Sequence, residues 1–444
     1  MNKELIGGWG RTPLVMTSVV RPDKAQLSEL ISRTSRLTPR GSGRGYGDCA
    51  VSADGVTVVS DLLKNIGTIE DGRVVVDAGV DLDELLRHVV PRGWFVPVTP
   101  GTKFVTIGGA IAADIHGKNH HRDGSFGEHI DWIEIMLADG TVVTVSPHDG
   151  ADIFWATIGG MGLTGFVLRA SVRLIPIRTS RIHVLTTRHN DLEDLMTAMM
   201  ERDQTHHYTV AWVDTLATGR RLGRSVLWAG DHADKSALKG RHARDPLHFA
   251  PRQRINVPEK PQFNLVKPAS VRIFNEFWFR KTSRRPSTSV QSIDQFFYPL
   301  DGVGNWNRLY GQDGFVQYQF SVPDERSELV QRFLDLLSVR RVPAFLSVLK
   351  RFGKESGGWI SFPSPGWTLA VDIPTSAEGI GPLLDGFDEE VADAGGRVYF
   401  AKDSRLRRSV VATMYPRLSQ FQELRRMIDP ESRFSSHLSR RLGL

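Results

Sequence analysis

The sequence predicts an α+β protein of two domains, and three observations support this. At 444 residues the chain exceeds the usual size of one hydrophobic core. Its first third mixes β-branched runs with helical patterns, without the regular strand–helix–strand repeat of an α/β protein. Near Thr179 the sequence pattern changes, and a helix predicted over residues 192–202 begins a second region.

The first region contains recognisable strand, helix and turn signals. Asp81 and Glu84 have the spacing of a capping box and predict a helix through Val90. Asp139-Gly140 is a two-residue hairpin signal between apolar runs over residues 132–145. Further strands are predicted over residues 56–60, 73–77 and 166–177.

The second region begins with that helix and a loop-rich basic stretch over residues 235–290. Two amphipathic helices are expected beyond it, over residues 325–339 and 383–395. The tail, residues 414–444, is predicted to be helical and basic. Strands are predicted over residues 316–322, 359–362, 367–373 and 397–401, the middle pair separated by a Pro-Ser-Pro-Gly turn.

Two glycine-dense loops carry the strongest functional signal. The first, residues 40–48, reads RGSGRGYGD, and the second runs over residues 100–119 with Gly101, Gly108, Gly109 and Gly117. Glycine lets backbone N–H groups approach an anion closely, and successive amides form a concave anion site. Two such loops suggest a ligand with two phosphates, so a dinucleotide is the natural candidate. Neither loop has the strand-to-helix G-x-G-x-x-G setting of a Rossmann fold, which predicts a differently built cofactor site.

Composition narrows the protein class. The single cysteine, Cys49, excludes an intrachain disulfide. Residues 1–13 lack the pattern of a secretory signal, and no apolar run approaches the length of a membrane span. We therefore expect no export or anchoring device in the chain itself.

The net charge of +6 is unevenly distributed. Residues 235–286 contain thirteen Lys or Arg and three Asp or Glu, which leaves about −4 for the remainder. This stretch has three interpretations: a solvated basic loop, contact with anionic lipid or a phosphate-bearing substrate, or nucleic-acid binding. The last is disfavoured because no nucleic-acid module accompanies the charge. The same stretch carries Phe249, Phe263, Phe274, Phe277, Trp278 and Phe279.

Several polar residues are candidates for chemistry. His116, His120 and His121 with Asp114 invite a metal site, but their spacing is not a zinc pattern, so we predict no metal. His116 shares the second glycine loop with Lys118, which places a titratable ring and a cation near the ligand, although a structural histidine is the alternative.

Four further residues have two possible roles, one in a site and one at the surface. Lys402 ends a predicted strand, where a lysine lies either on a pocket rim or in solvent. Gln317 and Gln319 face one side of a strand by period two, which suits recognition of several hydroxyls as well as simple exposure. Lys350 is ambiguous on its own.

A family resemblance rests on an ordered set of motifs, of which residues 114–121, DIHGKNHH, are the most specific. The chain resembles the flavoprotein oxidases of the vanillyl-alcohol oxidase type. Within them it is similar to the family of decaprenylphosphoryl-β-D-ribose 2′-oxidases, which act in actinobacterial cell-wall arabinan synthesis. The matching motifs cover nearly the whole chain: residues 8–12, 40–48, 100–102, 115–121, 154–160, 162–165, 306–308, 317–320, 401–405 and 414–417.

The resemblance implies a fold and a cofactor. A two-part FAD domain would comprise residues 1–178 and 397–444, with an α+β substrate domain, residues 179–396, inserted between them. Many sugar-alcohol oxidases of this fold tether the flavin through a histidine, but the matching residue here is Tyr46, so we expect non-covalent FAD. The implied FAD contacts are Arg40, Gly41, Ser42, Gly43, Arg44, Gly45, Tyr46, Gly47, Asp48, Cys49, Gly101, Thr106, Ile107, Gly108, Gly109, His116, Gly117, Lys118, Asn119, Val167 and Tyr399.

The resemblance also implies a pocket that departs from the family pattern. Ala370 stands where family inhibitors attack a cysteine, Thr368 stands at an asparagine position, and Val210 stands at a serine position. Covalent capture at Ala370 should therefore fail, because alanine has no nucleophile. The implied pocket residues are Lys402, Tyr46, His116, Lys118, Gln317, Gln319 and Lys350, with Trp212 at the flank.

The implied reaction is FAD-dependent oxidation of the 2′-hydroxyl of a polyprenyl-phospho-ribose to a ketone. Lys402 is the leading group to polarise or deprotonate that hydroxyl, with Tyr46 or His116 as a relay. Lys118 and Lys350 could hold the sugar or the phosphate. The resemblance further implies a short-chain NADH-dependent reductase partner and a peripheral location at the plasma membrane or cell envelope, without nucleic acid. The alternatives are a soluble aldonolactone or alditol oxidase of the same fold and a non-catalytic flavin-binding subunit.

Overall fold

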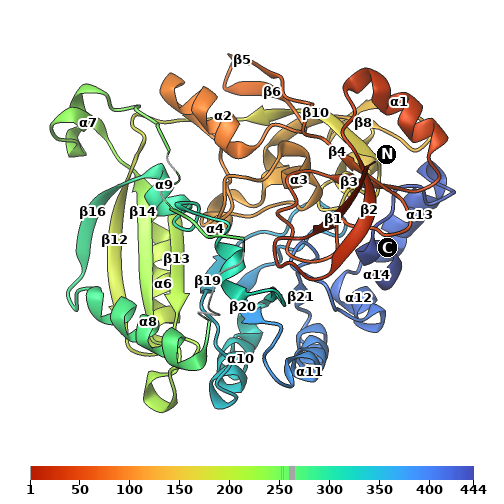
Figure 1. Cartoon of the computed structure of the whole chain (residues 1–444). Coiled ribbons are helices and arrows are strands. Elements are labelled where there is room, and N and C mark those ends of the chain that lie inside the picture. The colour runs from red at the N-terminus through yellow and green to blue at the C-terminus, as the bar shows by residue number, and fades with distance from the viewer. Residues whose placement is uncertain (1, 252, 254, 260–265) are drawn as a thin grey trace.

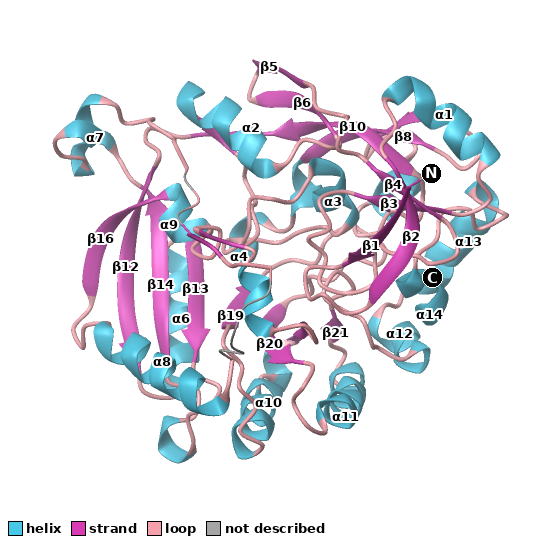
Figure 2. Cartoon of the chain, viewed as in Figure 1, coloured by secondary structure: helices cyan, strands magenta, loops and turns pink. Residues whose placement is uncertain are grey.

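The computed structural model describes residues 2–251, 253, 255–259 and 266–444. Met1 of the N-terminal segment and Phe263 of the basic stretch lie outside the described residues. Strands and helices are mixed in two parts on either side of a central region (Figures 1 and 2). The α+β prediction is confirmed.

The N-terminal part contains a four-stranded sheet, a five-stranded sheet and a separate two-stranded sheet in which β7 pairs with β11. The four-stranded sheet has the order β1-β2-β4-β3, in which β4 runs parallel to both β2 and β3. The five-stranded sheet is antiparallel throughout, with the order β5-β6-β10-β8-β9. The strands are β1 Asn2–Gly7, β2 Leu14–Val20, β3 Leu37–Arg40, β4 Val56–Val59, β5 Ile66–Glu70, β6 Arg73–Asp77, β7 Trp94–Phe95, β8 Ile130–Met136, β9 Val142–Val145, β10 Phe166–Arg173 and β11 Ile175–Pro176. The helices are α1 Lys24–Arg33, α2 Leu82–Val89, α3 Ile107–Ala112, α4 His120–Asp123 and α5 Ala151–Thr157.

The second part is built on one antiparallel sheet of eight strands, ordered β16-β12-β14-β13-β19-β20-β18-β21. Helix α6 packs on one face of β12, β14 and β13, and α11 packs against β18 and β21 (Figure 1). The strands are β12 Arg181–His189, β13 Tyr208–Val213, β14 Ser225–His232, β15 Ile255–Asn256, β16 Ser287–Ser292, β17 Val303–Gly304, β18 Phe315–Val322, β19 Ser347–Phe352, β20 Gly366–Pro374 and β21 Arg397–Val398. The helices are α6 Leu192–Thr205, α7 Arg241–Arg244, α8 Pro268–Lys281, α9 Ile293–Phe297, α10 Glu328–Val339 and α11 Ile380–Asp393.

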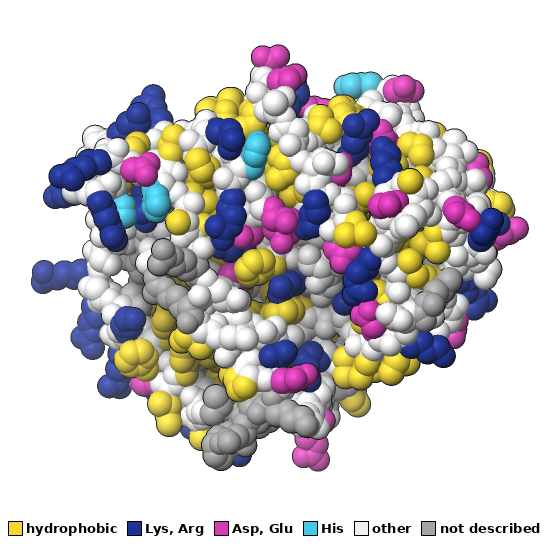
Figure 3. Space-filling view, turned by 45° about the horizontal axis from the view of Figure 1, so that its top comes forward, with side chains coloured by type: hydrophobic (Ala, Val, Ile, Leu, Met, Phe, Trp, Pro, Cys, Tyr) yellow, Lys and Arg dark blue, Asp and Glu magenta, His cyan; other side chains and the backbone are white. Residues whose placement is uncertain are grey.

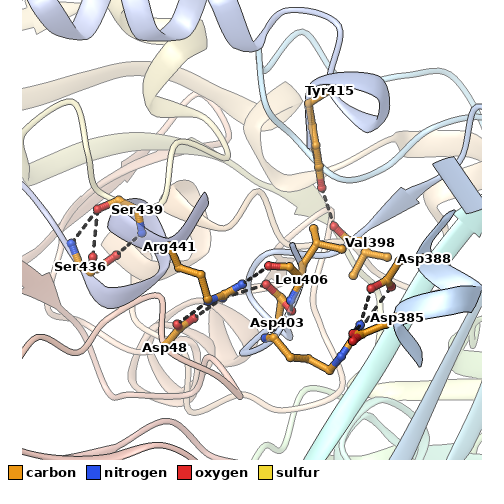
Figure 4. A network of polar contacts seen from close by, with 11 residues as sticks. Asp48, Asp385, Asp388, Val398, Asp403, Leu406, Tyr415, Ser436, Ser439 and Arg441 are labelled. Carbon is orange, nitrogen blue, oxygen red and sulfur yellow. Dashed lines mark hydrogen bonds and ion pairs between the residues drawn. The ribbon is translucent and has the colours of Figure 1, made fainter. Parts of the chain in front are cut away.

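The C-terminal tail forms α12 Arg408–Met414, α13 Leu418–Ile428 and α14 His437–Leu442. It returns to the N-terminal part, where both termini lie (Figure 1). Figure 4 shows the main link: the Arg441 guanidinium bonds both the Asp48 carboxylate at 2.8 Å and the Asp403 carboxylate at 2.9 Å. The tail therefore fixes the first glycine loop to the segment that carries Lys402. The division of the chain at residues 178 and 396 stays a prediction, and β21 itself belongs to the large sheet.

Most predicted elements are confirmed, including the Asp81–Glu84 capping box at the start of α2 and the hairpin with Gly140 at φ 86°. Three predictions are wrong in part. Residues 359–362 form a turn instead of a strand, since Gly358 and the Trp359 N–H pack against the end of α5. The stretch over residues 235–290 contains the fourteen-residue helix α8, which the dense basic residues obscured. The strand over residues 397–401 stops at Val398 and continues as a turn.

In the part of the chain that the structure describes, no helix combines the length and apolar character that crossing a bilayer requires.

Candidate active site

A cavity of about 780 Å³ lies between the two glycine loops and the eight-stranded sheet. We call its two sides the glycine wall, residues 40–49, 100–109 and 115–118, and the sheet wall, formed by β13, β18, β19 and β20 with α8. Most of the predicted site residues line it. They are Arg40, Gly41, Ser42, Gly43, Arg44, Gly45, Tyr46, Cys49, Gly101, Thr106, Gly108, Gly109, His116, Gly117, Lys118, Val167, Trp212, Gln317, Gln319, Lys350, Ala370, Tyr399 and Lys402.

Five predicted residues lie behind the cavity surface. Asp48 forms an ion pair with Arg441, and Ile107 is fully buried in the core of the N-terminal part. The Asn119 amide donates to the Pro97 carbonyl at 2.8 Å and to the Asp123 carboxylate. These three residues do not line the cavity, and their contacts support the loops from behind. Their assignment as direct FAD contacts stays a prediction.

The other two, Gly47 and Thr368, support side chains that do reach the cavity. A Cβ on Gly47 would lie 1.7 Å from the Asp403 carbonyl oxygen, so only glycine lets the two segments approach this closely. The Thr368 hydroxyl donates to the Phe320 carbonyl at 2.9 Å and accepts from the Gln319 amide at 3.2 Å.

The glycine wall fits a phosphate-bearing dinucleotide. A Cβ on Gly41 would stand 2.1 Å from the Thr106 Oγ1, which caps α3 by accepting the Gly109 N–H. Gly101 has open space where a Cβ would be, so its backbone borders the cavity directly. The buried Arg44 Nε has no hydrogen-bond partner among the described residues. Glycines that leave room beside the loops and a guanidinium Nε without a partner together form a cradle that suits an anion.

Lys402 reaches the cavity from a turn. Its backbone N–H donates to the Tyr399 carbonyl at 2.9 Å, and its Nζ lies 3.6 Å from the centroid of the Tyr46 ring. The Tyr46 N–H in turn donates to the Ala401 carbonyl at 2.7 Å, which clamps the turn to the first glycine loop. Burial lowers the pKa of Lys402 to about 7, although Asp372 opposes this shift. An amine with this pKa can exchange a proton near neutral pH.

His116 is held in one orientation by its neighbours. The Gln319 amide lies 3.0 Å from its Nε2, and the rings of Phe352, Phe362 and Tyr399 surround it. Burial, followed by the Lys350 charge, keeps the pKa of His116 well below its ordinary value, so the ring is neutral. Because the amide donates to Nε2, the proton is assigned to Nδ1, which has no partner among the described residues.

Two more lysines make the cavity electropositive. Lys118 donates to the Phe296 carbonyl and lies 4.3 Å over the Phe296 ring. Burial lowers the pKa of Lys118 to about 7 and that of Lys350 to about 8. The positive charge of Lys350 also contributes to the lowered pKa of Lys118. Neither forms an ion pair with a carboxylate within the described ranges. An anionic ligand placed between them would favour their charged forms.

Sequence reasoning missed Asp372. It is fully buried on β20, where it faces Gln317 on β18 and accepts a hydrogen bond from the Gln317 amide. Burial raises the pKa of its carboxyl, and the nearby Lys402 charge lowers it again. The sequence signal that could have identified Asp372 is its place inside the apolar strand Gly366–Pro374. An aspartate is rarely buried without a function or a partner.

Sequence reasoning named Phe274 and Trp278 as part of the basic stretch and Trp212 as a pocket residue, but it missed Trp228, Phe345 and the cluster that these five rings form on the sheet wall. Phe274 and Trp278 of α8 stack with their centroids 5.9 Å apart, and Phe345 lies 4.8 Å from Phe274. Trp228 lies 6.4 Å from Trp278 and packs with the predicted Trp212. The spacing of four between Phe274 and Trp278 was the helical signal, hidden by the loop prediction.

Asp114 and His120, which the sequence groups with His116, make structural hydrogen bonds. Asp114 accepts hydrogen bonds from the Ser125 and Ser361 hydroxyls and from the Gly127 N–H. His120 accepts from the Gly353 N–H at 3.1 Å. Within the described ranges, no group of three or more His, Cys, Asp or Glu side chains has the arrangement of a metal site.

Comparison with known proteins places these features in a family. The FAD binding domain family matches residues 19–146. The decaprenylphosphoryl-β-D-ribose oxidase of Mycolicibacterium smegmatis is 37% identical over 98% of this chain and 97% of its own length. An uncharacterized protein of Streptomyces coelicolor is 41% identical over 82% of this chain and its own full length. A D-lactate dehydrogenase of Archaeoglobus fulgidus is 27% identical over 36% of this chain and 38% of its own length.

Proposed function

The chain belongs to the family of FAD-dependent oxidoreductases that includes the decaprenylphosphoryl-β-D-ribose oxidase, and we propose that it oxidises the 2′-hydroxyl of a polyprenyl-phospho-ribose. The product is the 2′-keto sugar lipid, the first half of an epimerisation to the arabinose lipid used for cell-wall arabinan. We further propose that residues 1–178 and 397–444 form the cofactor domain and residues 179–396 the substrate domain.

The observation that carries this proposal is that one cavity combines three kinds of lining: the glycine-rich loops, three lysines (Lys118, Lys350 and Lys402), and a cluster of aromatic rings. A polyprenyl-phospho-sugar has three matching parts, a polar ring, a phosphate and an apolar chain. A soluble sugar alcohol would have no use for the aromatic residues on the sheet wall.

Lys402 removes the proton from the 2′-hydroxyl as C2′ is oxidised. The pKa of its amine is lowered to about 7 because burial opposes the charged form. Asp372 then stabilises the resulting ammonium electrostatically, and Gln317 orients the carboxylate. Neutral His116 donates a hydrogen bond from Nδ1, and Lys118 and Lys350 hold the phosphate or the sugar oxygens.

When bound, FAD supplies the redox chemistry by accepting the two electrons and the hydrogen from C2′. We propose that it is bound without a covalent bond, because Tyr46 stands at the position of the tethering histidine. Acid precipitation should therefore leave the flavin in the supernatant, whereas a flavin-bearing peptide in the pellet would contradict this assignment.

We propose two partners beyond the substrate. The keto product requires reduction, which a short-chain NADH-dependent reductase would supply. A lipid substrate requires a peripheral location at the plasma membrane or cell envelope, to which the basic stretch over residues 235–286 is suited.

The test is anaerobic mixing of the purified yellow protein with farnesylphosphoryl-ribose and, separately, with ribitol. Bleaching of the flavin by the prenyl substrate alone supports the proposal. Bleaching by ribitol at low concentration would identify a soluble alditol oxidase, and constant absorbance with both would identify a non-catalytic flavin protein.

A further inference from the structure

Helix α8 exposes two large apolar side chains to solvent. Ile273 is 72% exposed and Phe277 is 61% exposed, and both lie on one face because they are four residues apart. Exposed apolar residues are ordinary when scattered singly, but two on one short helical face form a stripe. No described element covers this stripe.

The opposite side of α8 belongs to the protein interior. Val271 and Phe279 are buried, and Asn275 donates to the Asp214 carboxylate at 2.6 Å. Between the two faces, Phe274 and Trp278 line the cavity. One helix therefore borders solvent with an apolar stripe and borders the cavity with aromatic rings.

Cations flank the exposed stripe along the chain, on α8 and just after its end. Arg272, Lys281, Arg284 and Arg285 are exposed and form no ion pair among the described residues. The acidic residue of α8, Glu276, is already bonded to Arg224 at 2.6 Å and to Arg280 at 2.5 Å. Figure 3 shows further Lys and Arg side chains gathered along the side of the molecule where α7 and the edge strand β16 lie.

We propose that the outer face of α8 docks on an anionic phospholipid bilayer and that the prenyl chain passes from the bilayer along Phe274 and Trp278 into the cavity. This inference deepens the proposed function and rests on it for the identity of the chain that passes. An apolar stripe flanked by uncompensated cations is the composition of a helix that lies in the plane of a membrane interface. The apolar centre of the stripe does not suit a nucleic-acid backbone, which would require cations there.

Vesicle flotation of the FAD-loaded protein tests the docking surface directly. The variant Ile273→Ser with Phe277→Ser removes the stripe, and Leu5→Ser with Met16→Ser is the matched control. Leu5 and Met16 are 59% and 54% exposed and pair across the β1–β2 hairpin, away from α8 (Figure 1). Both pairs remove two exposed apolar side chains, and retained flavin colour and melting temperature show that each variant is folded.

We expect wild-type protein to float with vesicles of phosphatidylglycerol and phosphatidylcholine, and to bind pure phosphatidylcholine more weakly. The α8 variant should lose about tenfold or more in affinity, whereas the control should bind as wild type does. Equal loss in both variants, or no binding of the wild type to anionic vesicles, would overturn the proposal. So would a stable protein complex, formed with a reductase partner, that the α8 substitutions abolish while vesicle binding is retained.

Turnover distinguishes failure of this inference from failure of the proposed function. With long-chain substrate embedded in vesicles, the α8 variant should show a raised KM, while flavin bleaching by dispersed farnesylphosphoryl-ribose should be unchanged. An unchanged KM on vesicles would contradict the route along α8 even if the oxidation itself is observed. If no variant oxidises either substrate but the α8 variant alone loses vesicle binding, the docking surface stands and the proposed reaction fails.

Discussion

The glycine wall and the sheet wall enclose the same cavity but are built differently. The glycine wall is rich in glycine, and at several of these positions a single added carbon would collide with a neighbouring segment. On the sheet wall, side chains on strands line the cavity, among them the long Gln317, Gln319 and Lys350 and the short Ala370 and Val210.

This difference separates two kinds of specificity. A wall made of backbone recognises a ligand through shape and amide groups, so its sequence has little freedom. A wall made of side chains can change by substitution while the strands keep their register. The family differences that the sequence shows at Ala370, Thr368 and Val210 all lie on the sheet wall or directly behind it.

The largest effect is expected at the point where the walls meet. Lys402→Ala should slow reduction of the flavin by substrate by about 10³-fold, within the range typical for loss of a general base. The protein should remain yellow, because the glycine wall is intact. Stopped-flow absorbance with prenylphosphoryl-ribose measures this rate, and reduction at wild-type speed would remove Lys402 from the mechanism.

The next effect concerns the backbone wall. Gly47→Ala should destabilise the holoenzyme by about 3 kcal/mol and weaken FAD binding, because its Cβ would meet the Asp403 carbonyl at 1.7 Å. Gly386→Ala is the matched control: its Cβ meets nothing within 4 Å on α11, so it should stabilise the protein slightly. Thermal melting with flavin release measures both, and equal behaviour of the two variants would refute the contrast between the walls.

A smaller effect concerns the pH dependence of the reaction. The reduction rate should rise with pH as Lys402 loses its proton, since burial lowers the pKa of Lys402 to about 7. Asp372 raises the pKa of Lys402, so Asp372→Asn should move this rising limb to lower pH. Asp335→Asn, on the exposed side of α10, serves as the control and should leave the limb in place. A shift of the limb to higher pH in the Asp372 variant would contradict the pairing.

The smallest functional effect is expected from a substitution on the sheet wall. Ala370→Cys places a thiol in the cavity and should change the activation free energy by only about 0.5 kcal/mol. Mass spectrometry after treatment with a thiol reagent should find one modified residue in this variant. Wild-type protein should resist modification, because burial raises the pKa of the Cys49 thiol to about 12. Rapid labelling of wild-type Cys49 would show that the glycine wall is more open than the structure implies.

Local patterns in the sequence predicted the elements that local chemistry determines. The capping box at Asp81 and the hairpin at Gly140 depend on neighbouring residues, so they could be read directly. The turn after Val398 could not, because it forms through contacts with the distant first glycine loop. Helix α8 was hidden because a high density of basic residues resembles a solvated loop until the buried face is known.

The site was predicted in the same uneven way. Glycine patterns and motifs identified the glycine wall and the lysines that reach it. Asp372 and the aromatic cluster emerge only when β18, β20 and α8 are brought together in space. Gly47 and Thr368 had been assigned as contacts, but their distinctive features are the close approach and the hydrogen bonds that they make behind the cavity surface.

One measurement tests the central claim most directly: anaerobic single-turnover reduction of the flavin by prenylphosphoryl-ribose deuterated at C2′. If the sugar lipid is oxidised at that carbon beside Lys402, bleaching should be slower than with undeuterated substrate, and substrate deuterated at C3′ should react at the undeuterated rate. A rate that depends on deuterium at C3′ and not at C2′, or an absence of bleaching with every sugar lipid, would contradict the account.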